Sequence, residues 1–206
     1  MVRTWAMRGT LHMLAADDVR WIIALLGSHF TRTGKRRRDQ LGLDPDTCRR
    51  GLAAIERVLA GSRPLTRAEL MAAIAAEGVA IDPTEQAPAH LVHYAAMQGP
   101  MCRGPEVGAD EPTYALLDEW VPSAPAVERD EALARLARRY LAGHGPATAA
   151  DLATWSGLPM PDARAAFEHN HRRAGGPGCG GHPDGCPRLD QSGDWPGRPA
   201  PSTGPV

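Results

Sequence analysis

The sequence predicts a mainly α-helical protein with short β-hairpins, and two observations support this fold class. Aromatic residues make up only 5% of the chain, and alanine is abundant, which favours close-packed helices because strands prefer β-branched and aromatic side chains. One helix-start pattern also occurs twice, at residues 64–70 and 146–152. Each copy has a loop proline, a threonine N-cap and an acidic residue three positions later that can bond back to the cap.

This repeated pattern predicts the domain organisation. Each predicted helix follows another helical segment and leads through a glycine, Gly78 or Gly157, into a further helical stretch. That order is typical of a helix-turn-helix, and its repetition is most simply interpreted as tandem winged-helix modules, which usually contact nucleic acid. The expected parts are a wing remnant of a first winged helix (1–14), a second module (15–126), an incomplete third module (127–168) and a disordered tail (169–206).

Hydrophobic spacing predicts the elements of the wing remnant and of the second module. Residues 2–7 and 10–14 are expected strands. A helix with apolar residues at helical spacing follows and is expected to end at Gly27. Asp44 before Pro45 predicts the start of the next helix, because proline is tolerated at the first helical position. The remaining expected elements are a helix at 66–77, a recognition helix at 87–98 and two strands forming a wing at 101–103 and 113–117.

The third module is expected to contain three helices and no wing. The expected helices span residues 128–142, 148–155 and 161–168. At His169 the composition changes abruptly to glycine and proline with few branched aliphatic residues. Such a segment cannot bury enough apolar surface to offset its ordering entropy, so we expect disorder from His169 onward. The abruptness of the change suggests a shift of reading frame near this point.

Composition excludes several classes of protein. The net charge is −1, so any binding to nucleic acid must be local rather than driven by a global positive field. The longest apolar run, residues 21–27, is too short to span a bilayer and does not resemble a signal peptide. We therefore expect a cytoplasmic protein without a membrane partner. The 4 cysteines are too few for a disulfide-built scaffold in a chain of this size.

A basic cluster supplies the main candidate DNA contacts. Its members are Arg32, Lys35, Arg36, Arg37 and Arg38, and the cluster contains no acid and is expected to form a loop between two helices. Such cations could neutralise several phosphates, and phosphate neutralisation dominates affinity for nucleic acid. The alternative interpretation is a solvated loop whose charges only maintain solubility.

Two further arginines complete the candidate DNA surface. Arg103 begins the proposed wing and Arg164 lies on the second recognition helix, so each could reach a phosphate or a base edge. The acidic residues of the wing loop would repel phosphate, and we therefore expect that this wing does not enter a groove. These acidic residues are Glu106, Asp110 and Glu111.

No metal, cofactor or catalytic site is predicted from the residues themselves. The spacing of Cys179, His182 and Cys186 matches no standard zinc motif. No Ser-His-Asp arrangement can be assembled, and no glycine-rich phosphate loop lies between a strand and a helix. The isolated histidines are interpreted as structural, and His12 is the one to test because it follows the segment 8–11 on a strand beside possible DNA contacts.

Residues 3–13, the capped helices and residues 114–119 together resemble the AlkZ-like DNA glycosylase family of winged-helix DNA-binding proteins. The resemblance extends over about residues 2–168, and the first of these motifs is the most specific. It implies tandem winged helices that cradle duplex DNA and excise alkylated or crosslinked bases by hydrolysing the N-glycosidic bond. The implied partner is duplex DNA, and no metal or cofactor is implied.

The chain departs from this family at the catalytic motif, which is a pair of glutamines, or a glutamine and an acid, separated by one residue. Gln40, Gln86, Gln98 and Gln191 are each isolated, so no catalytic residue is carried over. The resemblance also predicts that the chain is truncated at both ends. Two alternatives stay open, namely a winged-helix transcriptional regulator and an inactive pseudogene product. The absence of Lys and Arg from residues 87–98 counts against a regulator.

Overall fold

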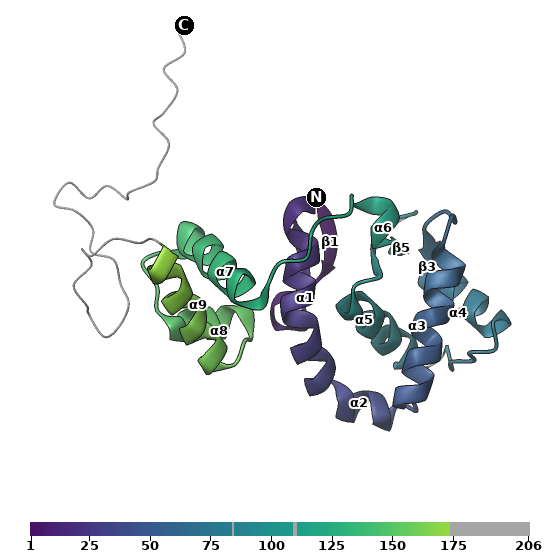
Figure 1. The fold of residues 1–206 in the computed structure, drawn as a ribbon. Coiled ribbons are helices and arrows are strands. Elements are labelled where there is room, and N and C mark those ends of the chain that lie inside the picture. Colours follow the sequence, from purple (N-terminus) through teal and green to yellow (C-terminus); the bar gives the residue numbers. More distant parts are fainter. Residues whose placement is uncertain (84, 109–110, 174–206) are drawn as a thin grey trace, which may run out of the picture.

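The computed structural model describes residues 1–83, 85–108 and 111–173, and it is mainly helical with one small antiparallel sheet (Figure 1). The helices are α1 (Ala16–Thr33), α2 (Lys35–Gln40), α3 (Pro45–Leu59), α4 (Arg67–Ala76), α5 (Ala87–Gln98), α6 (Leu117–Trp120), α7 (Arg129–His144), α8 (Ala149–Ser156) and α9 (Met160–Arg173). The strands are β1 (Val2–Trp5), β2 (Leu11–Leu14), β3 (Leu65–Thr66), β4 (Met101–Arg103) and β5 (Thr113–Leu116), and a 3-10 turn, η1 (Met7–Gly9), joins β1 to β2. The predicted fold class is confirmed as mainly α with short hairpins.

The first fourteen residues belong to the same sheet as the strands near residue 100. The strand order is β2-β1-β4-β5-β3, and every pair is antiparallel. Arg3 lies opposite Met13 on one side and opposite Arg103 on the other, and Arg103 lies opposite Tyr114. The N-terminal hairpin therefore extends the sheet of the α3–β5 segment and closes one of its edges.

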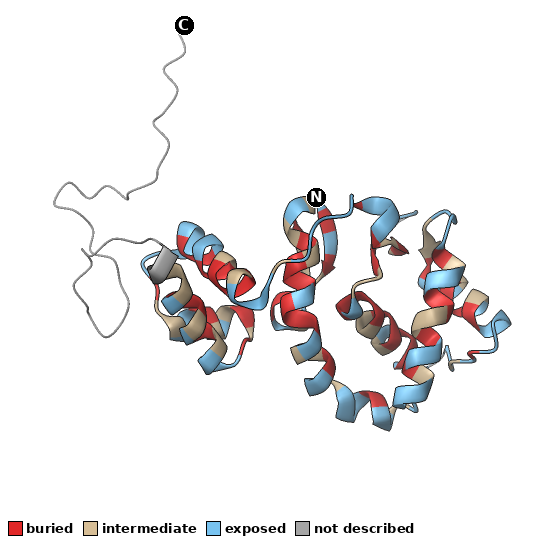
Figure 2. Cartoon of the chain, in the orientation of Figure 1, coloured by how far each residue is buried: buried red, intermediate tan, exposed pale blue. Residues whose placement is uncertain are grey.

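Two hydrophobic cores are built around α1 and α5. One core joins α1, β1 and β2 to the bundle of α7, α8 and α9, and the other joins α3, α4 and α5. Helix α5 contributes to both, since Met97 belongs to the first core and Leu91 to the second. Figure 2 shows the buried residues on the facing sides of these helices and the exposed residues on their outer sides.

The helix starts predicted from the repeated pattern are confirmed in atomic detail. Thr66 caps α4 by accepting a hydrogen bond from the Glu69 N–H, and the Glu69 carboxylate accepts one from the Thr66 N–H at 2.8 Å. Thr148 and Asp151 form the same reciprocal pair at the start of α8. The hydrogen bond from Arg63 is the main cause that lowers the pKa of Glu69 to about 2. Both helices therefore begin with a charged capping box.

Helix α1 continues past its predicted end at Gly27 and runs to Thr33. The glycine does not stop the helix but lies where α1 crosses α5. A Cβ placed on Gly27 would lie 2.0 Å from the carbonyl oxygen of Met97. The residue is therefore needed for the close approach of two backbones, which its absence of a side chain permits.

Helix α9 is also longer than predicted and corrects the boundary at His169. The helix continues to Arg173, although disorder was expected from His169. The apolar side chains that hold α9 against α7, such as Phe167, lie before His169. The helix extends beyond them, and the His169 imidazole lies 3.6 Å from the Asp130 carboxylate. The predictions for residues 174–206, including Cys179, His182 and Cys186, lie outside the described residues.

The turn between β1 and β2 is seated where three helices meet. Arg8 and Gly9 both have positive φ, 55° and 66°. The His93 side chain of α5 hydrogen-bonds to the Gly9 carbonyl oxygen at 3.2 Å. A Cβ on Gly157, at the end of α8, would lie 3.2 Å from the Arg8 Cα and 2.9 Å from the Phe30 ring. The hairpin tip thus links α1, α5 and α8.

We expect Gly27→Ala to lower the free energy of unfolding by about 1–3 kcal/mol, because overpacking forces the α1 and α5 backbones apart. Urea denaturation followed by circular dichroism measures this. Gly143→Ala is the control, since Gly143 lies in α7 with no atom within 4 Å of the added Cβ, and should be stabilising by about 0.4–1 kcal/mol. A Gly27→Ala protein as stable as the parent would show that the crossing is not tight.

The buried contact of His93 predicts a pH dependence of stability. Burial lowers the pKa of His93 below its ordinary value of 6.5, so below pH 6.5 the unfolded chain binds a proton that the folded chain resists. The free energy of unfolding should therefore fall as the pH is lowered through 6.5. Urea denaturation at pH 7.5 and 5.5 should show a smaller fall for His93→Gln than for the parent or for His144→Gln, an exposed-site control. Equal falls in all three would contradict this assignment.

Candidate nucleic-acid interface

The predicted basic cluster lies on helices rather than on a loop. Arg32 is in the last turn of α1, and the other members lie in α2. Lysine and arginine favour helix, and the Lys35 ammonium pairs with the Asp39 carboxylate at 2.6 Å in the i,i+4 arrangement that supports a helix. The expectation of a loop is therefore wrong, and an acid directly follows the cluster and neutralises one of its cations.

Arg38 differs from the other four because it is buried. Its side chain is only 7% exposed, and its guanidinium donates a hydrogen bond to the Thr31 carbonyl oxygen at 2.5 Å. The same group lies 4.8 Å from the ring centroid of Tyr94 on α5. Arg38 thus joins α2 to α1 and α5, and its charge is not available to an outside phosphate.

The remaining four cations form an exposed surface, which we call the cationic corner. Its members are Arg32, Lys35, Arg36 and Arg37, all exposed. They lie at the junction of α1 and α2, and Figure 1 shows α2 at the lower end of the body that contains α1, α3 and α5. Four cations within two helical turns create a local positive field that the net charge of the chain does not reveal.

Two glutamines that are isolated in the sequence meet at Arg37. The Arg37 guanidinium donates a hydrogen bond to the Gln86 side-chain oxygen at 2.8 Å and a longer one to that of Gln40 at 3.4 Å. Gln86 is the N-cap residue of α5. Sequence reasoning missed Gln86 because its partner is 49 residues away. Both glutamines orient the guanidinium that they contact.

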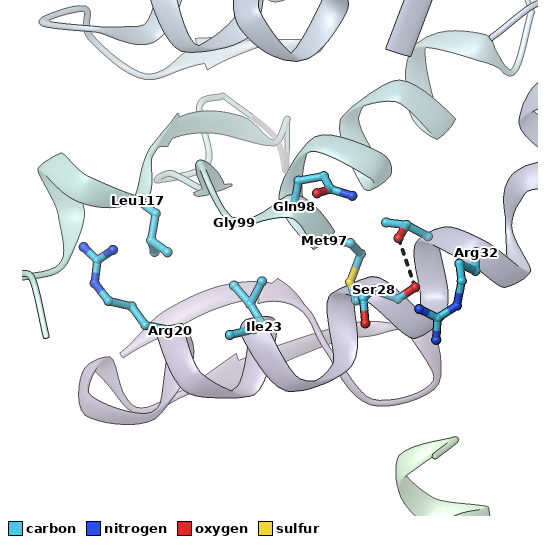
Figure 3. A pocket seen from close by; sticks show the side chains of 10 residues that line it. Arg20, Ile23, Ser28, Arg32, Met97, Gln98, Gly99 and Leu117 are labelled. Atoms are coloured by element: carbon cyan, nitrogen blue, oxygen red, sulfur yellow. Dashed lines mark hydrogen bonds between the residues drawn. The ribbon is translucent and has the colours of Figure 1, made fainter. Parts of the chain in front are cut away.

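A groove of about 420 Å³ runs between α1 and the end of α5 and leads to the cationic corner (Figure 3). Arg20 and Arg32 lie at its two ends. The Arg20 guanidinium is occupied, because it pairs with Asp118 at 2.7 Å and donates to the Val121 carbonyl oxygen at 2.7 Å. The other lining residues are Ile23, Ala24, Ser28, Thr31, Met97, Gln98, Gly99 and Leu117. Of the two arginines that line the groove, only Arg32 is therefore exposed.

Helix α5, the predicted recognition helix, is mostly covered. Seven of its residues are buried, among them Leu91 and Ala95. Within this helix only Ala89 and Gln98 are classed as exposed, while Tyr94 is half-buried beneath Arg38. Helix α5 therefore packs between α1 and α3 and offers little surface to a groove of DNA.

The structure does not bring the other candidate residues to the cationic corner. Arg103 is half-buried on β4, over the ring of Tyr114 at 5.6 Å, and Arg164 is exposed on α9. Figure 1 shows β5, next to β4 in the sheet, and α2 at opposite ends of the body that contains α1, α3 and α5, with α9 in the separate bundle. His12 hydrogen-bonds to the Met7 carbonyl oxygen at 3.1 Å and so braces the hairpin turn.

In residues 1–83, 85–108 and 111–173, no group of three or more His, Cys, Asp or Glu side chains is placed to hold a metal ion. Within the same part of the chain, no helix has both the length and the apolar character needed to cross a membrane. The two described cysteines, Cys48 and Cys102, are buried and free, and burial raises the pKa of the Cys102 thiol to about 11.

Comparisons with known proteins agree with the resemblance found in the sequence. The family model described as DNA glycosylase AlkZ-like matches residues 1–202. The solved structure of Streptomyces sahachiroi DNA glycosylase AlkZ is similar, with a TM-score of 0.67 and 24% identity over 81% of this chain and 47% of that chain. At this identity the likeness shows a shared fold, and this chain spans about half the length of that protein. None of the curated proteins matches the chain.

We expect Arg38→Met to lower the free energy of unfolding by about 1–3 kcal/mol, because it leaves the buried Thr31 carbonyl oxygen without its donor. Arg36→Met, on the exposed side of α2, is the matched control and should change stability by no more than about 0.5 kcal/mol. Urea denaturation of both variants provides the comparison. Similar small effects at both positions would show that Arg38 is a surface residue in solution.

Proposed function

Because this chain belongs to the AlkZ-like DNA glycosylase family, we propose that it binds duplex DNA through tandem winged-helix modules and that the cationic corner contacts the phosphates. The observation that carries the proposal is the grouping of four exposed cations at one junction of two helices. Of these, Lys35 has its own carboxylate partner and Arg37 is oriented by neutral amides.

The order of elements supports the winged-helix interpretation. The succession α3, β3, α4, α5, β4 and β5, with β5 between β4 and β3, is the order expected for a helix-turn-helix followed by a β-hairpin wing. Helices α7, α8 and α9 repeat the three-helix part, with the same capping box at the start of the middle helix. We therefore keep the proposed modules at residues 15–126 and from residue 127 onward, with residues 1–14 as the wing of a preceding one.

The proposed contacts act on the DNA backbone rather than on base sequence. Guanidinium and ammonium groups bind phosphate oxygens through charge-assisted hydrogen bonds and release condensed counterions. Arg32, Lys35, Arg36 and Arg37 are the proposed contacts at the corner, and Arg164 is a proposed contact from the C-terminal bundle. Arg38 holds the corner together from within. Such contacts position a protein on duplex DNA and predict strong dependence on salt.

We propose that this chain binds DNA without excising a base. The similar protein from Streptomyces sahachiroi is described as a DNA glycosylase. The family resemblance assigns catalysis to paired glutamines, and no segment of this chain contains such a pair. Among the described residues, the side-chain oxygens of Gln40 and Gln86 both accept hydrogen bonds from Arg37. A regulator that reads base sequence is disfavoured, because α5 presents only Ala89 and Gln98 as exposed residues.

Replacing the four corner residues together, in Arg32→Gln, Lys35→Gln, Arg36→Gln and Arg37→Gln, should weaken duplex binding and lower the salt slope of log K by about 3–4. Fluorescence anisotropy with a 20-base-pair duplex over a salt series measures both quantities. The full-length protein is used throughout, with circular dichroism confirming that each variant is folded.

The matched control removes four other exposed cations that already pair with carboxylates, namely Arg49, Arg50, Arg57 and Arg129. It should leave the affinity for the duplex within about twofold of the parent, since exposed arginines that already form ion pairs with carboxylates are expected to add little. Equal loss of binding in both quadruple variants would contradict a localised interface. Release of alkylated base by the parent chain would overturn the proposal of binding without excision.

A further inference from the structure

A second group of cations lies on the sheet, away from the cationic corner. Arg3 on β1 and Arg103 on β4 are directly opposite residues in the register, so their side chains leave the same face of the sheet, where like charges destabilise each other. Arg67, the first residue of α4, is exposed. We call these three residues the sheet arginine cluster.

Charge at this cluster is only partly balanced within the described residues. Glu106 forms an ion pair with Arg3, which leaves Arg67 and Arg103 without a carboxylate partner in the described part of the chain. The Arg103 Nε is buried and has no hydrogen-bond acceptor there. A buried polar nitrogen without an acceptor costs stability.

The register of the sheet places Arg103, Tyr114 and Arg67 close to one another. Burial is the main cause that lowers the pKa of the Arg103 guanidinium; the charges of Arg3 and Arg67 lower it as well, whereas Tyr114 and Glu106 raise it. The guanidinium lies 5.6 Å from the ring centroid of Tyr114, which is opposite Arg103 in the register on one side and opposite Leu65 on the other. Arg67 follows Thr66 at the end of this neighbouring strand β3, which places it beside Tyr114 and Arg103.

We propose that Arg67 and Arg103, with Tyr114 beside them, form an oxyanion site that accepts a phosphate group. Planar guanidinium groups match the geometry of phosphate oxygens and bind them in a bidentate manner. Arg3 forms an ion pair with the Glu106 carboxylate, and a phosphate would supply negative charge beyond that of this one acid. The phosphate comes either from a nucleic-acid backbone or from solution, and the first source rests on the proposed function.

The position of the site adds a second contact to the proposed DNA surface. Figure 1 shows β5 of the sheet and α2 at opposite ends of the body that contains α1, α3 and α5. A phosphate on the sheet arginine cluster is therefore distinct from any phosphate at the cationic corner. The two sites would engage separate parts of one nucleic acid.

The test is thermal unfolding of the full chain in sodium phosphate and in sodium chloride of equal ionic strength. Phosphate at about five times its dissociation constant is expected to raise Tm by about 2–4 °C. Arg67→Gln should abolish this difference, and its exposed position makes misfolding of the variant a small risk. Arg57→Gln, an exposed and ion-paired arginine on α3, should retain the difference.

The quadruple variant of the cationic corner separates this inference from the proposed function. It should keep the full effect of phosphate even though its duplex binding is lost. Loss of the phosphate effect in that variant, or its absence in the parent protein, would overturn the proposed site. A phosphate effect in a parent that binds no DNA would leave the site standing while the proposed function fails.

Binding of the 20-base-pair duplex distinguishes the two sources of phosphate. Arg67→Gln should weaken duplex binding about threefold to tenfold and lower the salt slope by about 1 if the backbone supplies the phosphate. Unchanged duplex binding together with a lost phosphate effect supports a site for free phosphate. Persistence of the phosphate effect in Arg67→Gln would overturn the proposal.

Discussion

The crossing of α1 and α5 at Gly27 is the contact on which the rest of the structure depends. With no side chain at Gly27, the two backbones approach closely, and α5 can then contribute Met97 to one core and Leu91 to the other. The opposite side of α1 carries the C-terminal bundle, through the ion pair of Asp18 with Arg139 at 3.1 Å and the stacking of Arg135 over Trp21 at 5.5 Å. One long helix therefore joins two bodies that have separate cores.

The same crossing determines how charge is presented. Because α1 continues past Gly27, its last turn and α2 project from the core as helices. Cations on the inner side of these helices are buried, and cations on the outer side are exposed. Arg38 turns inward to Thr31 and Tyr94, whereas Arg36 faces outward. Residues of one chemical type in one short segment thus have different roles, one structural and the others available for an anion. Helix α5, the expected recognition helix, is covered and contains no Lys or Arg, so the exposed positive charge lies at this junction instead.

Local signals in the sequence were sufficient to predict most elements. A capping box involves only residues within one helical turn, so Thr66 with Glu69 and Thr148 with Asp151 could be recognised without knowledge of the tertiary fold. The hairpin strands around residue 100 and the AlkZ-like resemblance were also predictable, and the family comparison confirms the latter. The end of α1 was not predictable, because a glycine inside a helix and a glycine after a helix look alike until the neighbouring helix is placed.

The sequence by itself determined the mainly helical class, the starts of the capped helices, the family and the existence of a basic cluster. Only the tertiary structure decided which cations are exposed, since Arg38 finds its acceptor through the turn between α1 and α2, and Arg37 finds Gln86 across 49 positions. It also decided that Arg3 and Arg103 meet, because strands β1 and β4 are neighbours in the sheet although they are far apart in the chain. Helix starts are governed by interactions within a few residues, whereas pairings between strands and the burial of a charge depend on long-range packing that no local pattern encodes.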